Sequence, residues 1–281
     1  MPSYRCGDRL ANRRDEIPVS DSRNEGGISL ERVCLYASFD EGVVADVSRG
    51  NPRPTINPAL VQHDPAGGRF GGRLVFDAFD NGFVHDECVF ESPGNFPFDP
   101  GGFEGTISIW LQGDPDDDLN DAFPIDPFHI SRHPADASFY LDLTRPNDWR
   151  YGSPRKLRYG FYGDSPAQDM FEGGWLLVAG ELGWNDREWH HVVATFRNVN
   201  SGNEDGSSAL YIDGQLRATM DGYRHQVTWD LAGIVINLGQ RYVGSIDDLL
   251  ILDEALSAGT VAALYERGEP AAAWWELPAG E

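Results

Sequence analysis

Several features that mark other classes of protein are scarce in this sequence. No apolar run approaches the roughly 18 residues that a membrane-spanning helix needs. The first 30 residues also lack the apolar stretch of a signal peptide. The 281 residues include 22 basic against 45 acidic residues, which gives a net charge of −23. Because nucleic acids and anionic membranes are bound by basic residues that neutralise phosphates, we expect neither as a partner, and no membrane insertion.

Cysteine is rare as well. The three cysteines, Cys6, Cys34 and Cys88, are too few for a disulfide scaffold, and their odd number leaves at least one without an intramolecular partner. Cys34 and Cys88 lie in strand-like runs, where they can be buried as small apolar side chains or form one disulfide. The sequence leaves both readings open.

The composition favours a turn-rich β protein. Hydrophobic residues make up 41% of the chain and aromatic residues 12%, which is enough for a sizeable core. The 32 glycines and 18 prolines separate short β-type runs, which predicts an antiparallel sandwich rather than a parallel sheet. We expect strands at 33–39, 73–76, 82–90, 105–112, 128–132, 138–143, 156–162, 175–181, 188–196, 208–212, 215–220, 233–238 and 242–252.

Two local patterns strengthen this prediction. Asp213 and Gly214 lie between two apolar runs, which predicts a tight type I′ hairpin, since glycine readily takes a positive φ. Near the end of the sequence we expect one short amphipathic helix with a capping serine, an apolar face and a terminal glycine: Ser257, then Val261, Leu264 and Tyr265, then Gly268.

Five motifs occur in the order in which one known family has them. They are residues 69–77 (RFGGRLVFD), 106–110 (TISIW), 188–196 (EWHHVVATF), 210–216 (LYIDGQL) and 244–252 (GSIDDLLIL). With these motifs the chain resembles, over roughly residues 33–267, the laminin-G-like jelly-roll domain of the concanavalin A-like lectin and glucanase superfamily. It departs from the family where Gly259 and Thr260 replace a usual acidic pair, and in a longer, more acidic segment at 113–174.

The resemblance implies an all-β fold, in which two antiparallel sheets pack as a jelly-roll sandwich with one short C-terminal helix. We expect an irregular tail at 1–32, the jelly-roll domain at 33–268 and a second tail at 269–281. The adjacent Trp274 and Trp275 of the second tail are expected to pack back onto the domain, with a partner site as the alternative.

The neighbouring His190 and His191 invite a metal or catalytic interpretation. Adjacent residues of a strand point to opposite faces, so the two cannot bind one ion together. In the family this pair is part of the structural core motif. We therefore expect core histidines with satisfied hydrogen bonds.

The resemblance also implies a structural Ca²⁺, which superfamily members often hold on the outside of the sandwich, between the first long strand and the last. The matching positions are Asp40 and Asp247, and the loop 46–51 can add carbonyl oxygens and the Asp46 carboxylate. Ca²⁺ binds about six to eight oxygens, so these residues are suitable ligands. Alternatively, Asp40 caps a turn and Asp247 is a polar residue of an edge strand.

A second acidic cluster, at 114–121, lacks the glycine and glutamate that an EF-hand loop needs at its sixth and twelfth positions. We therefore expect it to form a solvated loop.

Glycan binding requires an aromatic face for sugar C–H groups and fixed polar groups for hydroxyls. The long insertion offers Trp149, Tyr151, Trp175 and Trp184, together with Asp136, which lies in a stretch where some relatives hold a ligand-binding calcium. Alternatively, these aromatic residues cover the core beneath long loops.

Signatures of catalysis are missing. Glucanases of the superfamily carry their two carboxylates on one strand as Glu-x-Asp-x-x-Glu, and no such run occurs here; Glu87 and Glu91 lack the intervening aspartate. We therefore expect a non-catalytic, extracellular or cell-surface module that binds a glycan or polysaccharide. Two alternatives stay open: a structural or adhesive module that contacts surface proteins, and a divergent polysaccharide hydrolase or lyase.

Overall fold

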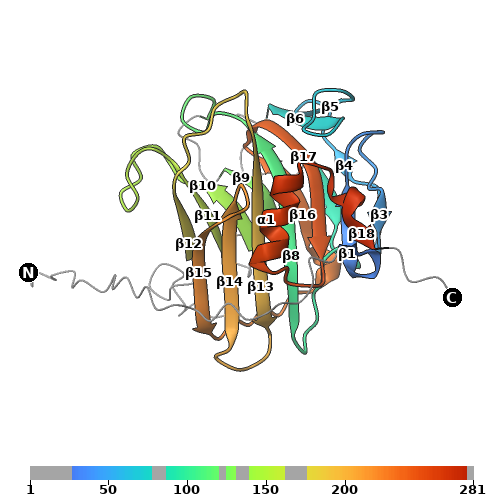
Figure 1. Ribbon diagram of the computed structural model, residues 1–281, viewed down its shortest axis with the longest axis vertical. Coiled ribbons are helices and arrows are strands. Elements are labelled where there is room, and N and C mark those ends of the chain that lie inside the picture. Colours follow the sequence, from blue (N-terminus) through green and yellow to red (C-terminus); the bar gives the residue numbers. More distant parts are fainter. Residues whose placement is uncertain (1–26, 78–86, 120–124, 131–138, 162–175, 277–281) are drawn as a thin grey trace, which may run out of the picture.

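The predicted all-β jelly-roll sandwich is confirmed. The computed structural model describes residues 27–77, 87–119, 125–130, 139–161 and 176–276. Within these residues the chain forms two antiparallel sheets packed face to face, with one α-helix on the outside (Figure 1). No helix of the described part is long and apolar enough to cross a membrane.

The first sheet, called sheet 1 here, has seven strands within the described residues. In spatial order these are β12 (Leu176–Glu181), β11 (Lys156–Phe161), β10 (Phe139–Leu143), β9 (Asp126–Ile130), β16 (Val235–Gln240), β7 (Cys88–Glu91) and β4 (Thr55–Ile56).

The second sheet, sheet 2, has nine strands in the same described part. Seven of them follow one another in the spatial order β15 (Gln215–Tyr223), β14 (Gly206–Ile212), β13 (Trp189–Val199), β8 (Phe103–Gln112), β17 (Val243–Leu252), β2 (Val33–Ala37) and β3 (Val47–Ser48). The other two lie beside this row: β6 (Arg73–Asp77) pairs with β17, and β5 (Val61–Asp64) pairs with β6. The antiparallel pairing of β2 with β17 joins the first long strand of the domain to the last.

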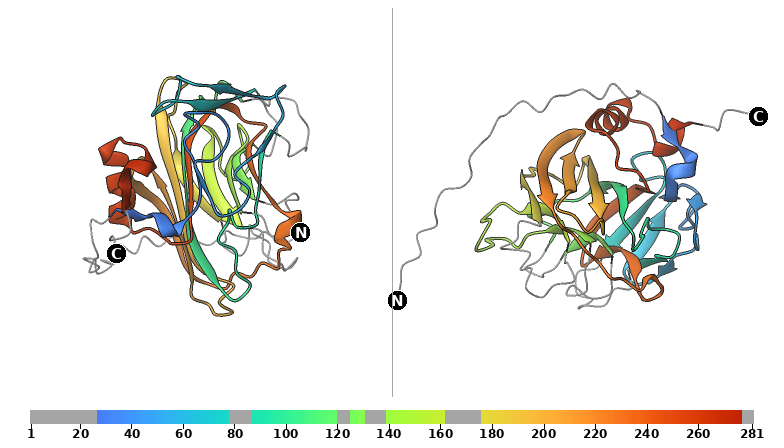
Figure 2. Two further views of the ribbon diagram at one scale, coloured as in Figure 1. Left: turned by 90° about the vertical axis from the view of Figure 1, so that its right-hand side faces the viewer. Right: turned by 90° about the horizontal axis from the view of Figure 1, so that it is seen from below.

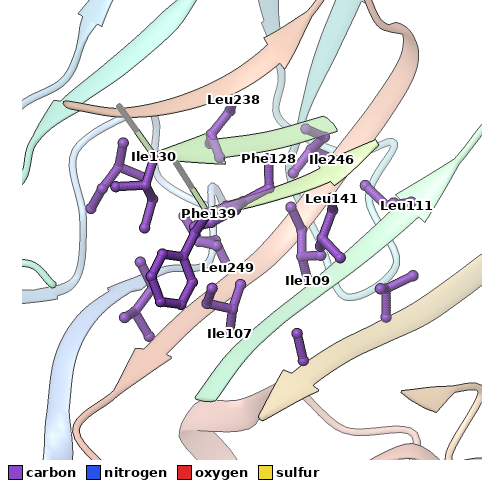
Figure 3. Packing of buried hydrophobic residues seen from close by; sticks show 14 of the residues in the cluster. Ile107, Ile109, Leu111, Phe128, Ile130, Phe139, Leu141, Leu238, Ile246 and Leu249 are labelled. Carbon is purple, nitrogen blue, oxygen red and sulfur yellow. The ribbon is translucent and has the colours of Figure 1, made fainter. Parts of the chain in front are cut away.

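The core lies between the two sheets because alternate residues of each strand point inward. Figure 3 shows side chains from β8, β9, β10, β16 and β17 meeting there. Those that the figure labels are buried: Ile107, Ile109, Leu111, Phe128, Ile130, Phe139, Leu141, Leu238, Ile246 and Leu249.

The predicted hairpin and helix are both confirmed. Asp213 and Gly214 have φ values of 52° and 72° and connect β14 to β15. Helix α1 (Ala258–Arg267) begins after Ser257, whose side chain accepts the N–H of Thr260, and ends at Gly268, where φ is 61°. It packs on the outer side of sheet 2 (Figure 2).

The folded unit extends beyond the predicted boundaries of 33 and 268. Strand β1 (Ile28–Ser29) pairs in parallel with β18 (Trp275–Glu276). In the described part of the chain, three short 3₁₀ helices accompany the strands, at Leu30–Arg32, Leu231–Gly233 and Ala271–Trp274. We call residues 269–276 the C-terminal strap.

Contacts with sheet 2 explain why the strap is ordered. Trp274 is buried, and Trp275 makes an edge-to-face contact with Tyr36 at a ring-centroid distance of 5.1 Å. Asp248 accepts hydrogen bonds from the Tyr36 hydroxyl at 2.6 Å and from the N–H of Ala271 at 3.1 Å. The prediction that the two indoles pack back onto the domain is thus confirmed.

Candidate functional site

The predicted carbohydrate-binding residues lie in different environments. Asp136 and Trp175 fall outside the described residues. Trp184 exposes only 6% of its surface and belongs to the hydrophobic core, so it offers no face to a ligand. Trp149, in contrast, is 83% exposed, and Tyr151 beside it is partly buried.

Trp149 lies in the loop 144–155, which connects β10 to β11 and projects at the left edge of Figure 1, in yellow-green. One carboxylate oxygen of Asp148 accepts the backbone N–H groups of Arg150 and Tyr151, at 2.9 and 3.2 Å. Across the loop, the hydroxyl of Ser153 accepts the backbone N–H of residue 147 at 2.8 Å. These bonds are local, so the loop's own sequence fixes the shape that presents the indole.

One cation–π contact lies within this loop, and a second connects the loop to sheet 1. The guanidinium carbon of Arg150 lies 4.3 Å from the centroid of the Trp149 ring. The guanidinium carbon of Arg158, on β11, lies 5.8 Å from the ring of Tyr151. Tyr151 therefore connects the loop that carries the exposed indole to the sheet below it.

The outer side of sheet 1 carries a cluster of polar side chains, which we call the polar face. On β9, β10, β11 and β16 the apolar residues that point into the core alternate with these polar ones. Each of them is at most 5% exposed: Glu87, Asp126, His129, Tyr140, Asp142, Arg158, Asn237 and Gln240.

Register places these residues side by side. Tyr140 and Asn237 are both cross-strand partners of His129, and Asp142 is the partner of Arg158. Residues opposite one another on the same face have Cβ atoms about 5 Å apart. The polar face therefore continues from β11 to β16.

An ion pair joins β10 to β11 in the polar face. The carboxylate of Asp142 accepts two hydrogen bonds from the guanidinium of Arg158. Burial raises the pKa of Asp142 to about 6, although the positive charge of Arg158 acts in the opposite direction. Both groups are therefore charged at neutral pH.

A second group of hydrogen bonds lies between β9 and β16. His129 Nδ1 is 2.7 Å from the carboxylate of Asp126 and 3.2 Å from the amide oxygen of Gln240. Asn237 donates to the carboxylate of Glu87 at 3.1 Å.

Three atoms of the polar face have no hydrogen-bond partner in the described structure: Asp126 Oδ1, Asn237 Oδ1 and Gln240 Nε2. An unsatisfied buried polar atom costs about 1–3 kcal/mol, so such atoms indicate a site where a hydroxyl group or water can bind.

The sequence contains a signal for this polar face that is independent of its aromatic residues. In each strand a single polar residue lies between two apolar ones, as His129 does between Phe128 and Ile130. A buried strand interrupted in this way on several neighbouring strands marks a polar surface on one side of the sheet.

Two of the three predicted calcium ligands, Asp40 and Asp247, contact the turn 67–72. Asp247, on β17, is fully buried, and its Oδ2 accepts the backbone N–H of Phe70 at 3.1 Å. Asp40 Oδ1 accepts the N–H of Gly72 at 2.9 Å. Asp46 is exposed and accepts a backbone N–H just beyond the end of β2 at 2.7 Å.

This arrangement does not fit one ion held by three carboxylates. Among the described residues, no group of three histidine, cysteine, aspartate or glutamate side chains is placed to hold a metal. Both carboxylate oxygens of Asp247 and one oxygen of Asp40 accept backbone N–H groups, which compete with a cation for these oxygens. Calcium binding therefore stays a prediction.

The two histidines pack in different parts of the domain, but their hydrogen bonding is not fully satisfied as expected: within the described structure His190 Nε2 and His191 Nδ1 have no hydrogen-bond partner. His191 Nε2 is 2.8 Å from the hydroxyl of Ser108, and its ring stacks on Trp110 below α1. His190 stacks instead on Trp184, and its Nδ1 is 2.9 Å from the carboxylate of Asp213. The two rings contact different surroundings and share no ligand.

The structure also describes two of the cysteines and part of the acidic cluster at 114–121. Cys34 and Cys88 are both free and buried, whereas Cys6 lies outside the described residues. In the acidic cluster at 114–121, the described Asp114 accepts the backbone N–H groups of Asp116 and Asp117 and thus stabilises a turn.

Comparison with protein families gives one match. A family model described as the concanavalin A-like lectin/glucanases superfamily matches residues 92–262. No curated protein sequence matches the chain closely enough to count as a relative.

Solved structures with the same fold include domain 4 of AbnA, an extracellular arabinanase from Geobacillus stearothermophilus, in complex with arabinotriose. It is 17% identical, with a TM-score of 0.52, and the match covers 83% of this chain and 98% of that domain. The ligand-binding domain of botulinum neurotoxin serotype D, in complex with N-acetylneuraminic acid, is 12% identical, with a TM-score of 0.54. That match covers 85% of this chain but only 54% of the toxin domain.

The binding domain of Paraclostridial Mosquitocidal Protein 1 is 12% identical, with a TM-score of 0.56 and coverage of 84% of this chain and 52% of that one. The chain thus spans about half of the toxin binding domains that it matches. At these identities the likeness concerns the fold.

Proposed function

This chain belongs to the concanavalin A-like lectin/glucanase superfamily, and from that premise we propose that it is a non-catalytic carbohydrate-binding module. Two structural neighbours were solved with sugars bound, arabinotriose in one and N-acetylneuraminic acid in the other. Their fold is shared, but a fold hosts many functions, so the proposal depends on the site itself.

The exposed indole of Trp149 is the observation that carries the proposal. A tryptophan that is 83% exposed does not contribute its hydrophobic surface to the stability of the fold. Its flat face can instead pack against the C–H groups of a sugar ring. The loop that holds it is fixed by its own hydrogen bonds, so little conformational entropy is lost on binding.

The polar face next to this loop supports the same function. Arg158 contacts Tyr151 of the loop and Asp142 of the sheet. Asn237 and Gln240 are fully buried in this structure, so the polar face supports the proposal through the contact of Arg158 with the loop and not through an open sugar subsite.

The experiment that tests the proposal is a glycan array followed by calorimetry with Trp149→Ala. We expect the variant to lose at least tenfold in affinity, because an exposed aromatic platform contributes binding free energy and little folding free energy. Leu216→Ala is the matched control: Leu216 is also an exposed large apolar residue, at 50%, but lies on β15 of the other sheet.

If Trp149→Ala and Leu216→Ala bind the glycan with equal affinity, the loop 144–155 is not part of the binding site. Absence of saturable binding across the array would overturn the function and favour the structural or adhesive alternative. Release of reducing ends from a polysaccharide would show an enzyme. An extracellular or cell-surface location, where glycans are displayed, belongs to the same proposal.

A further inference from the structure

Asp142 lies in the polar face, but a chain of contacts connects it to the exposed indole of Trp149. Its carboxylate accepts two hydrogen bonds from the guanidinium of Arg158, its cross-strand partner on β11. The guanidinium carbon of Arg158 lies 5.8 Å from the centroid of the Tyr151 ring. Only one residue separates Tyr151 from Trp149 along the chain. A change at Asp142 can therefore alter the position of the indole.

The turn 148–152 joins Tyr151 and Trp149 into one unit. The carboxylate of Asp148 accepts the backbone N–H groups of the two residues that follow Trp149, at 2.9 and 3.2 Å. Its backbone carbonyl accepts the N–H of Gly152 at 2.7 Å. These bonds fix the shape of the turn but not its orientation on the sheet, so a turn that loses the contact of Tyr151 can move as a whole and carry the indole with it.

The base of this loop is held by other contacts. The guanidinium of Arg155 donates to the backbone carbonyls of Thr144 and Leu119, at 2.9 and 3.2 Å. The N–H of Thr144 donates to the carbonyl of Lys156, and the N–H of Lys156 donates to the Thr144 hydroxyl, each at 2.9 Å. None of these bonds involves Asp142, so loss of its charge leaves the base in place and acts on the tip.

The Asp142–Arg158 pair is buried, with each side chain only 4% exposed. Water therefore replaces neither partner readily, and the guanidinium depends on the carboxylate for its position. The charged and titratable groups that face Asp142 come from β9 and β11: Asp126, His129 and Arg158. Burial raises the pKa of Asp142 to about 6, so mild acid neutralises it. A neutral carboxyl group holds a guanidinium less strongly, because hydrogen bonds to ionised groups are about twice as strong as neutral ones.

We propose that Asp142 is a positioning residue of the glycan site: acting through Arg158 and Tyr151, its carboxylate holds the loop tip in the orientation that binds the sugar. This inference rests on the proposed carbohydrate-binding function and adds its regulation. The site holds its ligand while Asp142 is charged, at neutral pH, and releases it when Asp142 is neutralised in mild acid.

The first test needs no glycan. In ¹⁵N relaxation measurements on the parent protein at pH 7.5, we expect the backbone amides of residues 149–151 to be rigid, with order parameters of about 0.85. In Asp142→Asn, and in the parent at pH 5, these values should fall below about 0.6, while those of Thr144 and Lys156 at the base stay unchanged. Equal order parameters of the tip in the parent and in Asp142→Asn would overturn the inference.

Calorimetry measures the effect on binding, with the uncharged hexasaccharides of cellulose, xylan, arabinan and laminarin as probes. Because these probes do not titrate, an effect of pH belongs to the protein. We expect the parent to bind about fivefold more weakly at pH 5 than at pH 7.5, since a mobile tip loses conformational entropy on binding. Asp142→Asn should have the weak affinity at both pH values, and an affinity equal to that of the parent at pH 7.5 would contradict the proposal.

Glu87→Gln is the matched control. Glu87 is also a fully buried carboxylate of the polar face, but it accepts a hydrogen bond from Asn237 on β16 and precedes β7, toward the edge of sheet 1 opposite β11. We expect this variant to keep the rigid tip and the pH-dependent affinity of the parent. An affinity that is independent of pH in Glu87→Gln as well would assign the effect to the polar face as a whole and overturn the role of Asp142.

Stability separates positioning from a general loss of structure. Folding raises the pKa of Asp142 from 3.8 to about 6, so between these values acid protonates it in the folded chain first and increases the free energy of unfolding. Relative to Asp142→Asn, the parent should therefore become more stable as its affinity falls. An affinity that decreases together with this stability difference would show a structural role only.

Tyr151 allows a test that leaves the buried pair intact. Tyr151→Leu removes the ring that Arg158 contacts, whereas Tyr151→Phe keeps it, so we expect a mobile tip in the first variant and a rigid tip in the second. A rigid tip in both would overturn the inference and leave the proposed function to the Trp149→Ala test. Absence of binding to every glycan would overturn the proposed function instead, and the relaxation data would still decide whether Asp142 holds the tip.

Discussion

Trp149 and Trp184 were both predicted to bind a glycan but have opposite environments. The first is 83% exposed at a loop tip, and the second is 6% exposed in the core. Nothing in the flanking sequence separates them, because burial depends on which distant strands pack against each residue. Sequence reasoning could therefore predict an aromatic-rich segment but not which of its indoles faces solvent.

This difference predicts different costs of substitution. Trp184→Ala should lower the free energy of unfolding by about 3–5 kcal/mol, because it removes a large core side chain and leaves a cavity. Trp149→Ala should change it by no more than about 0.5 kcal/mol. Urea unfolding of both variants measures this, and similar losses would contradict the assigned environments.

Because His191 is buried, we expect the free energy of unfolding to depend on pH. Burial lowers its pKa to about 4, below the ordinary value of 6.5. Between pH 6.5 and pH 4, His191 is therefore protonated in the unfolded chain but neutral in the folded one. Protonation stabilises the unfolded chain, so the free energy of unfolding decreases as pH falls through this window.

The comparison with His191→Gln isolates this effect from other titrating groups. The stability advantage of the parent protein over the variant should shrink by about 3 kcal/mol between pH 7 and pH 4, since each pKa unit is worth about 1.4 kcal/mol. A constant difference across this range, in denaturant titrations at each pH, would argue against a buried neutral imidazole.

At the scale of elements, strong local sequence patterns predicted strands, a turn and a helix correctly. The Asp213–Gly214 hairpin, helix α1 and the long strands β8, β13 and β17 follow from turn chemistry and alternation. The two-residue strands β3 and β4 were not predicted, because so short a run contains no periodicity. Their pairing is set by the neighbouring strands.

Gly239 shows how one residue fits an element into the sandwich. It lies within β16 with a φ of +85°, and a Cβ there would be 2.0 Å from the ring of Phe76 on β6. Gly239→Ala should therefore lower the free energy of unfolding by about 2 kcal/mol or more. Gly233→Ala is the control, because a Cβ at that position meets no atom within 4 Å.

Thermal and urea unfolding of these two glycine variants provides the measurement. If Gly239→Ala and Gly233→Ala have the same free energy of unfolding, the chain near Phe76 can move to make room for a Cβ. That result would contradict a closely packed contact between the two sheets.

For the molecule as a whole, the order of five motifs was enough to predict the two-sheet sandwich. Of the predicted site residues, Trp149 and Tyr151 lie in the loop 144–155, where Tyr151 contacts Arg158 of the polar face. The polar face itself was not predicted. It is assembled from β9, β10, β11 and β16, which are far apart in sequence, so only the register of the sheet brings its residues together.

The predicted calcium requirement is tested on the whole protein. If an ion stabilises the fold, exhaustive chelation lowers the unfolding temperature and added Ca²⁺ restores it, because a ligand of the folded state stabilises it by mass action. Differential scanning calorimetry with and without chelator measures this. An unchanged transition would contradict the prediction and agree with the N–H groups found against Asp40 and Asp247.

The pairing of β1 with β18 has a practical consequence. It brings residues 28 and 275 together on one side of the molecule, while the loop 144–155 projects on the other (Figure 1). Immobilising the protein on a sensor chip through a site introduced next to residue 28 or residue 275 should therefore leave the loop 144–155 facing away from the chip surface.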